Sequence, residues 1–195
     1  MPDLQGYDFG TAQAAHSPVT LDELRALEAA VGWTNEDAAL LRDAGRRVLI
    51  DQAEAMVDSW RADIARQPEL VKWFFGPDGK PDDDYKAAVK RRFMQWVVDS
   101  CTRPHDQAWL DYQEEIGLRH TPAKKNRTDG AHTPPLVPLR YLLGFMAPIG
   151  MSVTAFLRKA GVAEPEVARM QAAWAKSVLL HVTLWSRPYA RDGLW

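Results

Sequence analysis

The sequence predicts an all-α fold, and three observations lead to that class. Apolar residues recur at steps of three and four along most of the chain, the spacing that places side chains on one face of a helix. These runs begin and end near proline, glycine and capping residues, which are typical of helix boundaries. Almost no segment has the character of a strand. At 195 residues we expect one domain, with an irregular arm at residues 1–17 and a helical core at residues 18–195.

The composition narrows the classes of function. A formal net charge of -2 and a pI near 6.2 give no electrostatic case for nucleic-acid binding. The only cysteine, Cys101, cannot form an intrachain disulfide, and the first residues have no basic segment followed by an apolar one, so we expect a cytoplasmic location. The longest uncharged run, residues 141–157, is short for a bilayer span and is interrupted by glycine and proline. We therefore expect a buried helix there and no membrane role.

Two short helices are predicted after the arm. The Ser-Pro pair at residues 17–18 has the character of a capped start, and Thr34, three residues before Asp37, gives a second start. The apolar residues between these two starts are Leu21, Leu24, Leu27 and Val31.

Two long amphipathic helices are predicted next, separated by a short helical piece at residues 69–75 and the turn GPDGKPDDD. The first ends before Pro68, because the residue before a proline disfavours helix. Its apolar face carries Leu49, Ala53, Met56, Trp60 and Ile64. The face of the second carries Tyr85, Val89, Phe93, Trp96 and Val97.

The helix beyond Pro104 ends near a histidine. Its apolar face carries Trp109, Tyr112, Ile116 and His120, so the His120 side chain is expected to point inward. Gly117 and Pro122 weaken and end this helix, and residues 121–135 form a polar loop.

The last two predicted helices are the most apolar. One starts near Pro138, is apolar on most of its circumference and is expected to be central; its residues include Leu142, Phe145, Ile149, Val153 and Phe156. The other begins at Pro165 and ends before Pro188. Its stripe carries Val167, Met170, Trp174, Val178, His181 and Trp185.

The histidines are the candidate chemical groups, since glycine-rich phosphate loops, paired cysteines and HExxH pairs do not occur in the sequence. We expect His16, His105 and His132 to be solvated, whereas His120 and His181 lie on apolar faces. Each of these two is either a core imidazole bonded to a carbonyl oxygen or a single axial ligand to haem iron. Eight tryptophans could enclose such a flat group or only fill a core. Cations that could meet the haem propionates favour His120 over His181 as the ligand, since it lies near a helix end beside Arg119, Lys124, Lys125 and Arg127.

Several long blocks decide between these readings: WLDYQEEIGLRH, KKNRTDG, PLVPLRYLLGFMAPI and LWSRPYARDGLW, with the early GYDFG and SPVT. Along its whole length the sequence resembles the protoglobins, the single-domain relatives of globin-coupled sensor domains. The resemblance implies a globin-like fold, a three-over-three helical sandwich with an extra N-terminal helix and an arm that helps to bury the haem. It also implies haem b and a homodimer formed through the last two helices.

The resemblance implies a set of site residues. His120 is the proximal ligand and the only protein ligand of the iron, and Arg92 is a partner for a haem propionate. The expected haem contacts are His120, Trp60, Phe74, Arg92, Phe93, Tyr112, Ile116, Leu142, Phe145 and Ile149. The expected ligand side of the haem holds Trp60, Arg61, Val89, Phe93, Phe145 and Ile149.

Two positions on the ligand side depart from common patterns. Val89 stands where most globins have a distal histidine, and Arg61 stands where protoglobins often have a tyrosine. A guanidinium resists burial without a counter-charge, so we expect Arg61 to turn outward and pair with Asp58.

Three hypotheses on function follow. The first is reversible binding of dioxygen, carbon monoxide or nitric oxide at a haem iron held by His120. The second is catalysis at the same iron, such as peroxidase-like turnover or nitric oxide oxidation, although an apolar wall supplies no proton shuttle. The third is a helical interaction module without a cofactor, in which the aromatic residues are core only.

Overall fold

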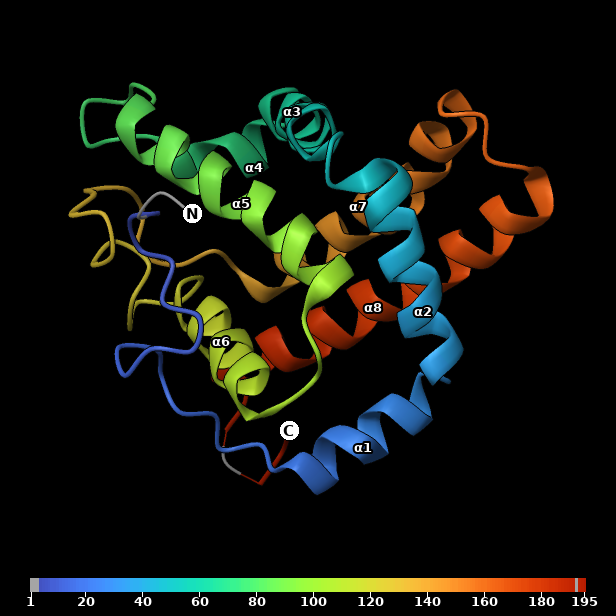
Figure 1. Cartoon of the computed structure of the whole chain (residues 1–195). Coiled ribbons are helices and arrows are strands. Elements are labelled where there is room, and N and C mark those ends of the chain that lie inside the picture. The colour runs from blue at the N-terminus through green and yellow to red at the C-terminus, as the bar shows by residue number, and fades with distance from the viewer. Residues whose placement is uncertain (1–3, 192) are drawn as a thin grey trace.

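The computed structural model describes residues 4–191 and 193–195, and the regular structure of this part of the chain is helical (Figure 1). Its α-helices are α1 (Leu21–Ala30), α2 (Asn35–Ala44), α3 (Ala53–Ala65), α4 (Pro68–Val71), α5 (Asp83–Thr102), α6 (Gln107–Leu118), α7 (Leu139–Lys159) and α8 (Glu164–Ser186). Three shorter helical turns are η1 (Gly45–Leu49), η2 (Lys72–Phe74) and η3 (Arg187–Tyr189). Within the described residues, β pairing is limited to an isolated bridge between Phe75 and Pro81. The predicted all-α class is confirmed.

Helix α8 is central to the packing. It contacts α7, α2 and α6, while α5 packs against α2 and α3 (Figure 1). The predicted stripe of α8 is buried along its whole length, from Val167 to Trp185. A main cluster of buried apolar side chains joins α2, α3, α5, α7 and α8. This core packs against the site described below.

Helix α1 is held by a second, smaller cluster. Its members are Val19, Leu24, Trp109, Leu110, Leu180 and Leu184. Burying one leucine completely is worth roughly 1.5–3 kcal/mol, and Leu24 is fully buried. The cluster therefore fastens α1 to α6 and α8.

The starts of α1 and α2 are both capping boxes. Thr20 and Glu23 cap α1, and Thr34 and Asp37 cap α2 with reciprocal side-chain to backbone hydrogen bonds. The second start is the predicted one. The first lies after the predicted Ser-Pro pair, because the Ser17 hydroxyl accepts from the Val19 N–H and so holds a turn before the helix.

The long helix predicted from Leu49 begins later, at Ala53, because the π-helical η1 comes before it. Gly45, at the start of η1, lies so close to α5 that an added Cβ would be 2.5 Å from the Cβ of Cys101. A glycine is thus required where these two segments meet.

Helix α7 is buried on one side only. Its inner face is buried through Leu142, Met146, Ile149, Val153 and Leu157. On its outer face Leu143 is 46% exposed and Met151 is 75% exposed. In the described part of the chain α7 alone is long and apolar enough to cross a membrane, and 22% of its most apolar stretch is buried. The prediction of a buried helix holds for the inner face of α7 and is wrong for its outer face, which the described residues leave open.

The arm is irregular, as predicted, and it is fastened to the surface of α5 and α6. The Tyr7 hydroxyl donates to Asp99 over 2.8 Å, and the Ala15 N–H donates to Glu115 over 3.0 Å. The Arg119 guanidinium donates to Asp8 over 2.6 Å. Residues 1–3 of the predicted arm lie outside the described residues.

Candidate functional site

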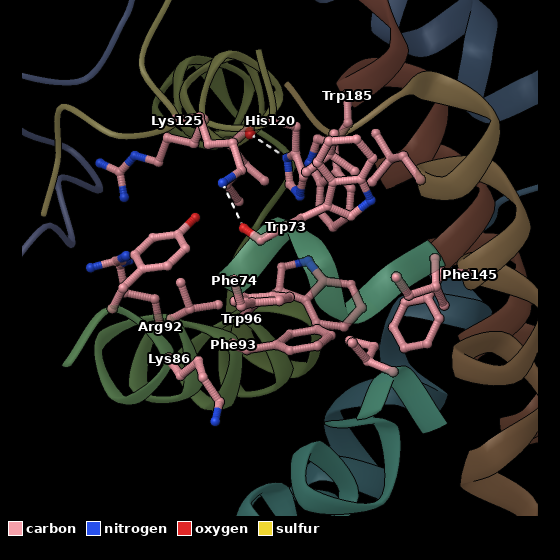
Figure 2. A pocket seen from close by; sticks show the side chains of 18 of the residues that line it. Trp73, Phe74, Lys86, Arg92, Phe93, Trp96, His120, Lys125, Phe145 and Trp185 are labelled. Atoms are coloured by element: carbon pink, nitrogen blue, oxygen red, sulfur yellow. Dashed lines mark hydrogen bonds between the residues drawn. The ribbon is translucent and has the colours of Figure 1, made fainter. Parts of the chain in front are cut away.

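A cavity lies among α3, α5, the end of α6, the start of α7 and the end of α8, and it is also lined by the short helical pieces α4 and η2 and by the loop at residues 125–137 (Figure 2). The cavity volume, counted as the space available to the centre of a water molecule, is about 230 Å³. One enclosed water needs roughly 10–15 Å³ counted in the same way, so the cavity is much larger than a site for a single water. The predicted site residues that line it are Arg61, Phe74, Val89, Arg92, Phe93, Tyr112, Ile116, His120, Leu142 and Phe145. The fold therefore brings together ten of the twelve residues predicted from the sequence.

His120 lies just beyond the last residue of α6, and its ring is oriented by the helix backbone. Its Nδ1 lies 2.8 Å from the carbonyl oxygen of Ile116, which can only accept a hydrogen bond. Nδ1 therefore carries the proton, and in the neutral imidazole Nε2 is left with a free lone pair. Burial lowers the pKa of His120, more strongly than the Ile116 carbonyl raises it, and Lys125 and Arg119 lower it further. The neutral form is favoured, as a metal ligand requires.

The backbone around His120 is also fixed. The Tyr189 hydroxyl lies 2.7 Å from the carbonyl oxygen of Val137 and 3.1 Å from that of His120. The Trp185 ring stacks on the imidazole, with centroids 6.0 Å apart and an interplanar angle of 21°. The imidazole thus has one defined orientation at the wall of the cavity.

The wall across from His120 is apolar and aromatic. Figure 2 shows Phe93 opposite His120, with Phe145 to one side. Val89, Leu142 and Met146 also line the cavity, so valine lines it at the position where the family resemblance places a usual distal histidine. The apolar and aromatic side chains of this wall offer van der Waals contact and have no titratable group.

Two predicted residues, Trp60 and Ile149, are absent from the cavity lining. Trp60 is 1% exposed and lies behind Phe93, with the two ring centroids 5.0 Å apart. Its indole N–H donates to the Ser152 hydroxyl over 2.9 Å. Ile149 is fully buried in the main core cluster. Both support the wall from behind.

His181 occupies a different environment from His120. Its Nδ1 lies 2.8 Å from the Ser177 carbonyl oxygen, but its ring is enclosed by Trp96, Trp109 and Trp185 and does not reach the cavity. Burial lowers its pKa to about 3. His181 is thus a core imidazole, the first of the two readings of the sequence.

His105 also departs from the sequence-based prediction, which had it solvated. Its ring stacks against Trp33 and lies tilted against Trp109, at centroid distances of 5.0 and 4.1 Å. Its Nδ1 lies 2.7 Å from Glu28. The prediction is wrong because α1 folds back over the start of α6, a contact that no local pattern contains. His16 and His132 are exposed, as predicted.

Cations surround the cavity, and most of them are neutralised. Arg92 makes a bidentate pair with Asp129, at 2.9 and 2.6 Å. Arg119 pairs with Asp8 and Glu115, and Lys86 pairs with Asp83. Arg61 pairs with Asp58 over 3.5 Å, as predicted, while still lining the cavity. Among the cavity-lining cations that the structure describes, Lys125 has no carboxylate partner within ion-pair distance.

Several lining residues escape the sequence-based set. Tyr85 and Trp96 lie on the predicted apolar face of α5, and Trp185 lies on that of α8. The helical spacing of these residues could therefore have identified them as inward-facing. Trp73 lies in the single helical turn η2 and Lys125 in the loop after α6, and neither segment carries a periodic pattern that indicates which side chains turn inward. The Trp96 indole N–H has no hydrogen-bond partner among the described residues and lies within an aromatic cluster, edge-on to Trp174 and His181.

Comparisons with known proteins agree on the family and the fold. The sequence model of the family described as Protoglobin matches residues 20–195. Among solved structures, the chain is similar to the globin domain of a Geobacter sulfurreducens globin-coupled sensor, with a TM-score of 0.66 and 17% sequence identity over 86% of this chain and 97% of that one. At that identity the likeness concerns the fold alone. No curated protein matches the chain.

Proposed function

The chain belongs to the protoglobin family and has a globin fold, and from this premise we propose that it binds haem b in the cavity and reversibly binds dioxygen, carbon monoxide or nitric oxide there. His120 would be the only protein ligand of the iron. The observation that carries the proposal is the hydrogen bond from His120 Nδ1 to the Ile116 carbonyl, because it leaves Nε2 unprotonated at the cavity wall. When bound, the haem would supply the iron on which a diatomic gas is held.

The residues of the cavity fit such a group. A porphyrin needs an apolar slot with one nitrogen donor and cationic groups for its carboxylates. The cavity offers the His120 imidazole, apolar and aromatic walls, and cations at its edge. No other described histidine lines the cavity, so the donor set favours a single protein ligand.

Each residue around His120 has a definable role in holding the haem. The Ile116 carbonyl accepts a hydrogen bond from the Nδ1–H group, which makes Nε2 a stronger electron donor, as the outer partners of metal-bound histidines do. Trp185 and Tyr189 hold the ring and its backbone in place. Phe93 and Phe145 exclude water from the opposite side. The arm closes one edge, because Tyr7 and Phe9 pack on Tyr112 at centroid distances of 5.2 and 5.5 Å.

The opposite wall favours gas binding over turnover of peroxide. Cleavage of peroxide is assisted by a group that moves a proton, and Val89, Phe93 and Phe145 have none. Arg61, a polar side chain that also lines the cavity, is paired with Asp58. A small neutral ligand can be accommodated in such a wall without any proton transfer.

The experiment is reconstitution of the purified apoprotein with ferric haem, reduction, and exposure to carbon monoxide. A sharp Soret band of the carbon monoxide complex is expected in wild type and in His181→Ala. His120→Ala should have the spectrum of haem without a protein nitrogen ligand. An unchanged spectrum in His120→Ala, or wild type without a Soret band, would refute the proposal.

We further propose a homodimer formed through α7 and α8. The support is the open outer face of α7, together with Leu179 on α8, which is 52% exposed. Large exposed apolar patches mark interaction surfaces, and homo-oligomers are most often two-fold dimers. We also propose a cytoplasmic location, supported by the single cysteine, Cys101, which cannot form an intrachain disulfide.

A further inference from the structure

Lys125 is a buried cation with an unusual set of partners. The residue is 3% exposed, and its Nζ donates to the carbonyl oxygen of Trp73 over 2.9 Å (Figure 2). It also donates to the Thr133 hydroxyl over 2.6 Å. The Thr133 hydroxyl in turn donates to the Asn126 side-chain oxygen over 2.9 Å, so its lone pairs are directed at Lys125. The ammonium is thus held in place by neutral oxygen atoms.

The neutral partners fix the ammonium without balancing its charge. A lysine ammonium has three N–H donors, and two are used by Trp73 and Thr133. The Tyr85 ring face, 4.9 Å from Nζ, adds a cation–π contact. Burial lowers the pKa of Lys125 to about 8, which expresses the cost of keeping this charge away from water without an anion.

From this arrangement we propose that Lys125 binds a carboxylate of the haem, and that the site therefore selects porphyrins carrying a free carboxylate at this corner of the cavity. The inference rests on the proposed function. A carboxylate would supply both the missing negative charge and an acceptor for the remaining N–H.

Arg92, the propionate partner implied by the family resemblance, is less suited to this part. Its side chain is 11% exposed, and both terminal nitrogens are bound to Asp129, which is 6% exposed. Arg92 also donates to the Gln5 carbonyl oxygen of the arm. A second carboxylate at Arg92 would lie beside the buried charge of Asp129 and be repelled by it. The Arg92–Asp129 pair is better understood as a clasp that fastens the arm.

The test compares ferric protoporphyrin IX with its dimethyl ester, which has the same ring and iron but no ionised carboxylate. Apoprotein is titrated with each porphyrin in dilute mild detergent, and the ratio of the two dissociation constants is the preference for the free acid. In Lys125→Met this preference should fall by about 10- to 100-fold, the value of a hydrogen bond to a charged group. In Lys125→Arg most of it should remain.

The matched control is Lys86→Met, since Lys86 also lines the cavity but is paired with Asp83. It should keep the wild-type preference. The inference is overturned if Lys125→Met keeps that preference or if Lys86→Met loses as much of it. Wild-type protein that takes up neither porphyrin would instead refute the proposed function.

The stability of the apoprotein separates binding from structure. Removing an uncompensated buried charge is neutral or stabilising when the replacement packs well. Lys125→Met apoprotein should therefore unfold at a urea concentration no lower than wild type. Loss of the preference together with a clearly destabilised apoprotein would count against a direct contact with the carboxylate.

Discussion

Trp60 and Phe93 lie in two consecutive layers, with ring centroids 5.0 Å apart and only Phe93 at the cavity wall. Trp60 is anchored by its hydrogen bond to Ser152 and also stacks on Trp174, at 6.5 Å. The family resemblance implied direct contact of both residues with the haem ligand. In the structure Phe93 restricts the pocket, whereas Trp60 supports Phe93 from behind.

Substitution should distinguish these two roles. Phe93→Leu removes ring atoms from the wall, so the haem protein should bind bulky isocyanides faster while losing little stability. Trp60→Leu removes a large buried side chain and its hydrogen bond, and should lower the free energy of unfolding by about 3 kcal/mol or more. Stopped-flow binding and urea unfolding measure the two effects. A Trp60 variant that changes ligand rates more than stability would contradict the layered arrangement.

Arg61 should have little influence on bound dioxygen, because its guanidinium is engaged by Asp58 and is 32% exposed. Arg61→Leu should change the decay rate of the ferrous-oxy form by less than about threefold. Arg61→Tyr introduces a neutral hydroxyl, and a hydrogen bond worth about 0.5–1.5 kcal/mol would slow dioxygen release by about 2- to 12-fold. The decay and release are followed by absorption. A large acceleration in Arg61→Leu would mean that the arginine itself stabilises the ligand.

The free energy of unfolding of the apoprotein should decrease in acid, partly through His181. Its pKa is about 3 in the folded protein and about 6.5 when unfolded. Between these values the unfolded chain binds more protons, so His181 stabilises the fold above about pH 6.5 and this contribution is lost as the pH falls toward 3.

The measurement is urea unfolding of wild type and His181→Leu between pH 7.5 and 5. The wild-type curve should be steeper by up to about 1.4 kcal/mol per pH unit below pH 6.5. Above pH 7 the two slopes should coincide, which serves as the internal control. Parallel curves across the acid range would contradict the burial of His181 in the folded state.

The outer face of α7 should mediate self-association. Met151→Glu places a charge on the most exposed apolar position of that face, which is 75% exposed, and should shift a dimer to monomer in analytical ultracentrifugation at micromolar concentration. The spectrum of the carbon monoxide complex should stay unchanged, because Met151 does not line the cavity. A wild-type monomer, or a Met151→Glu dimer of wild-type affinity, would contradict the proposed interface.

Sequence reasoning predicted the parts of the fold that depend on local pattern. The stripe of α8 and the inward face of α6 with His120 follow from helical spacing, since these residues must share one side. The Thr34 start follows from its capping box. The family resemblance supplied the predicted site residues, and helical spacing agrees with most of them, because side chains on the inward faces of α5, α6 and α7 meet at one place.

The features that sequence reasoning missed depend on contacts between distant segments. The break at η1 arises where Gly45 meets Cys101, and the burial of His105 arises where α1 covers it. The sequence indicated Lys125 only as one of several cations near His120, and only the placement of Trp73 and Thr133 around it makes it a buried cation. The outer face of α7 looked like core because the sequence does not specify which side of an apolar helix stays open.

The most direct test of His120 as the iron ligand is rescue of a cavity variant by free imidazole. His120→Gly removes the side chain that we propose binds the iron, and added imidazole can enter the space it leaves. We expect the ferrous His120→Gly protein to lose the wild-type absorption spectrum and to recover it with millimolar imidazole. The His181→Gly protein should have the wild-type spectrum both with and without imidazole. A His120→Gly protein with the wild-type spectrum before imidazole is added would contradict the assignment of His120 as the iron ligand.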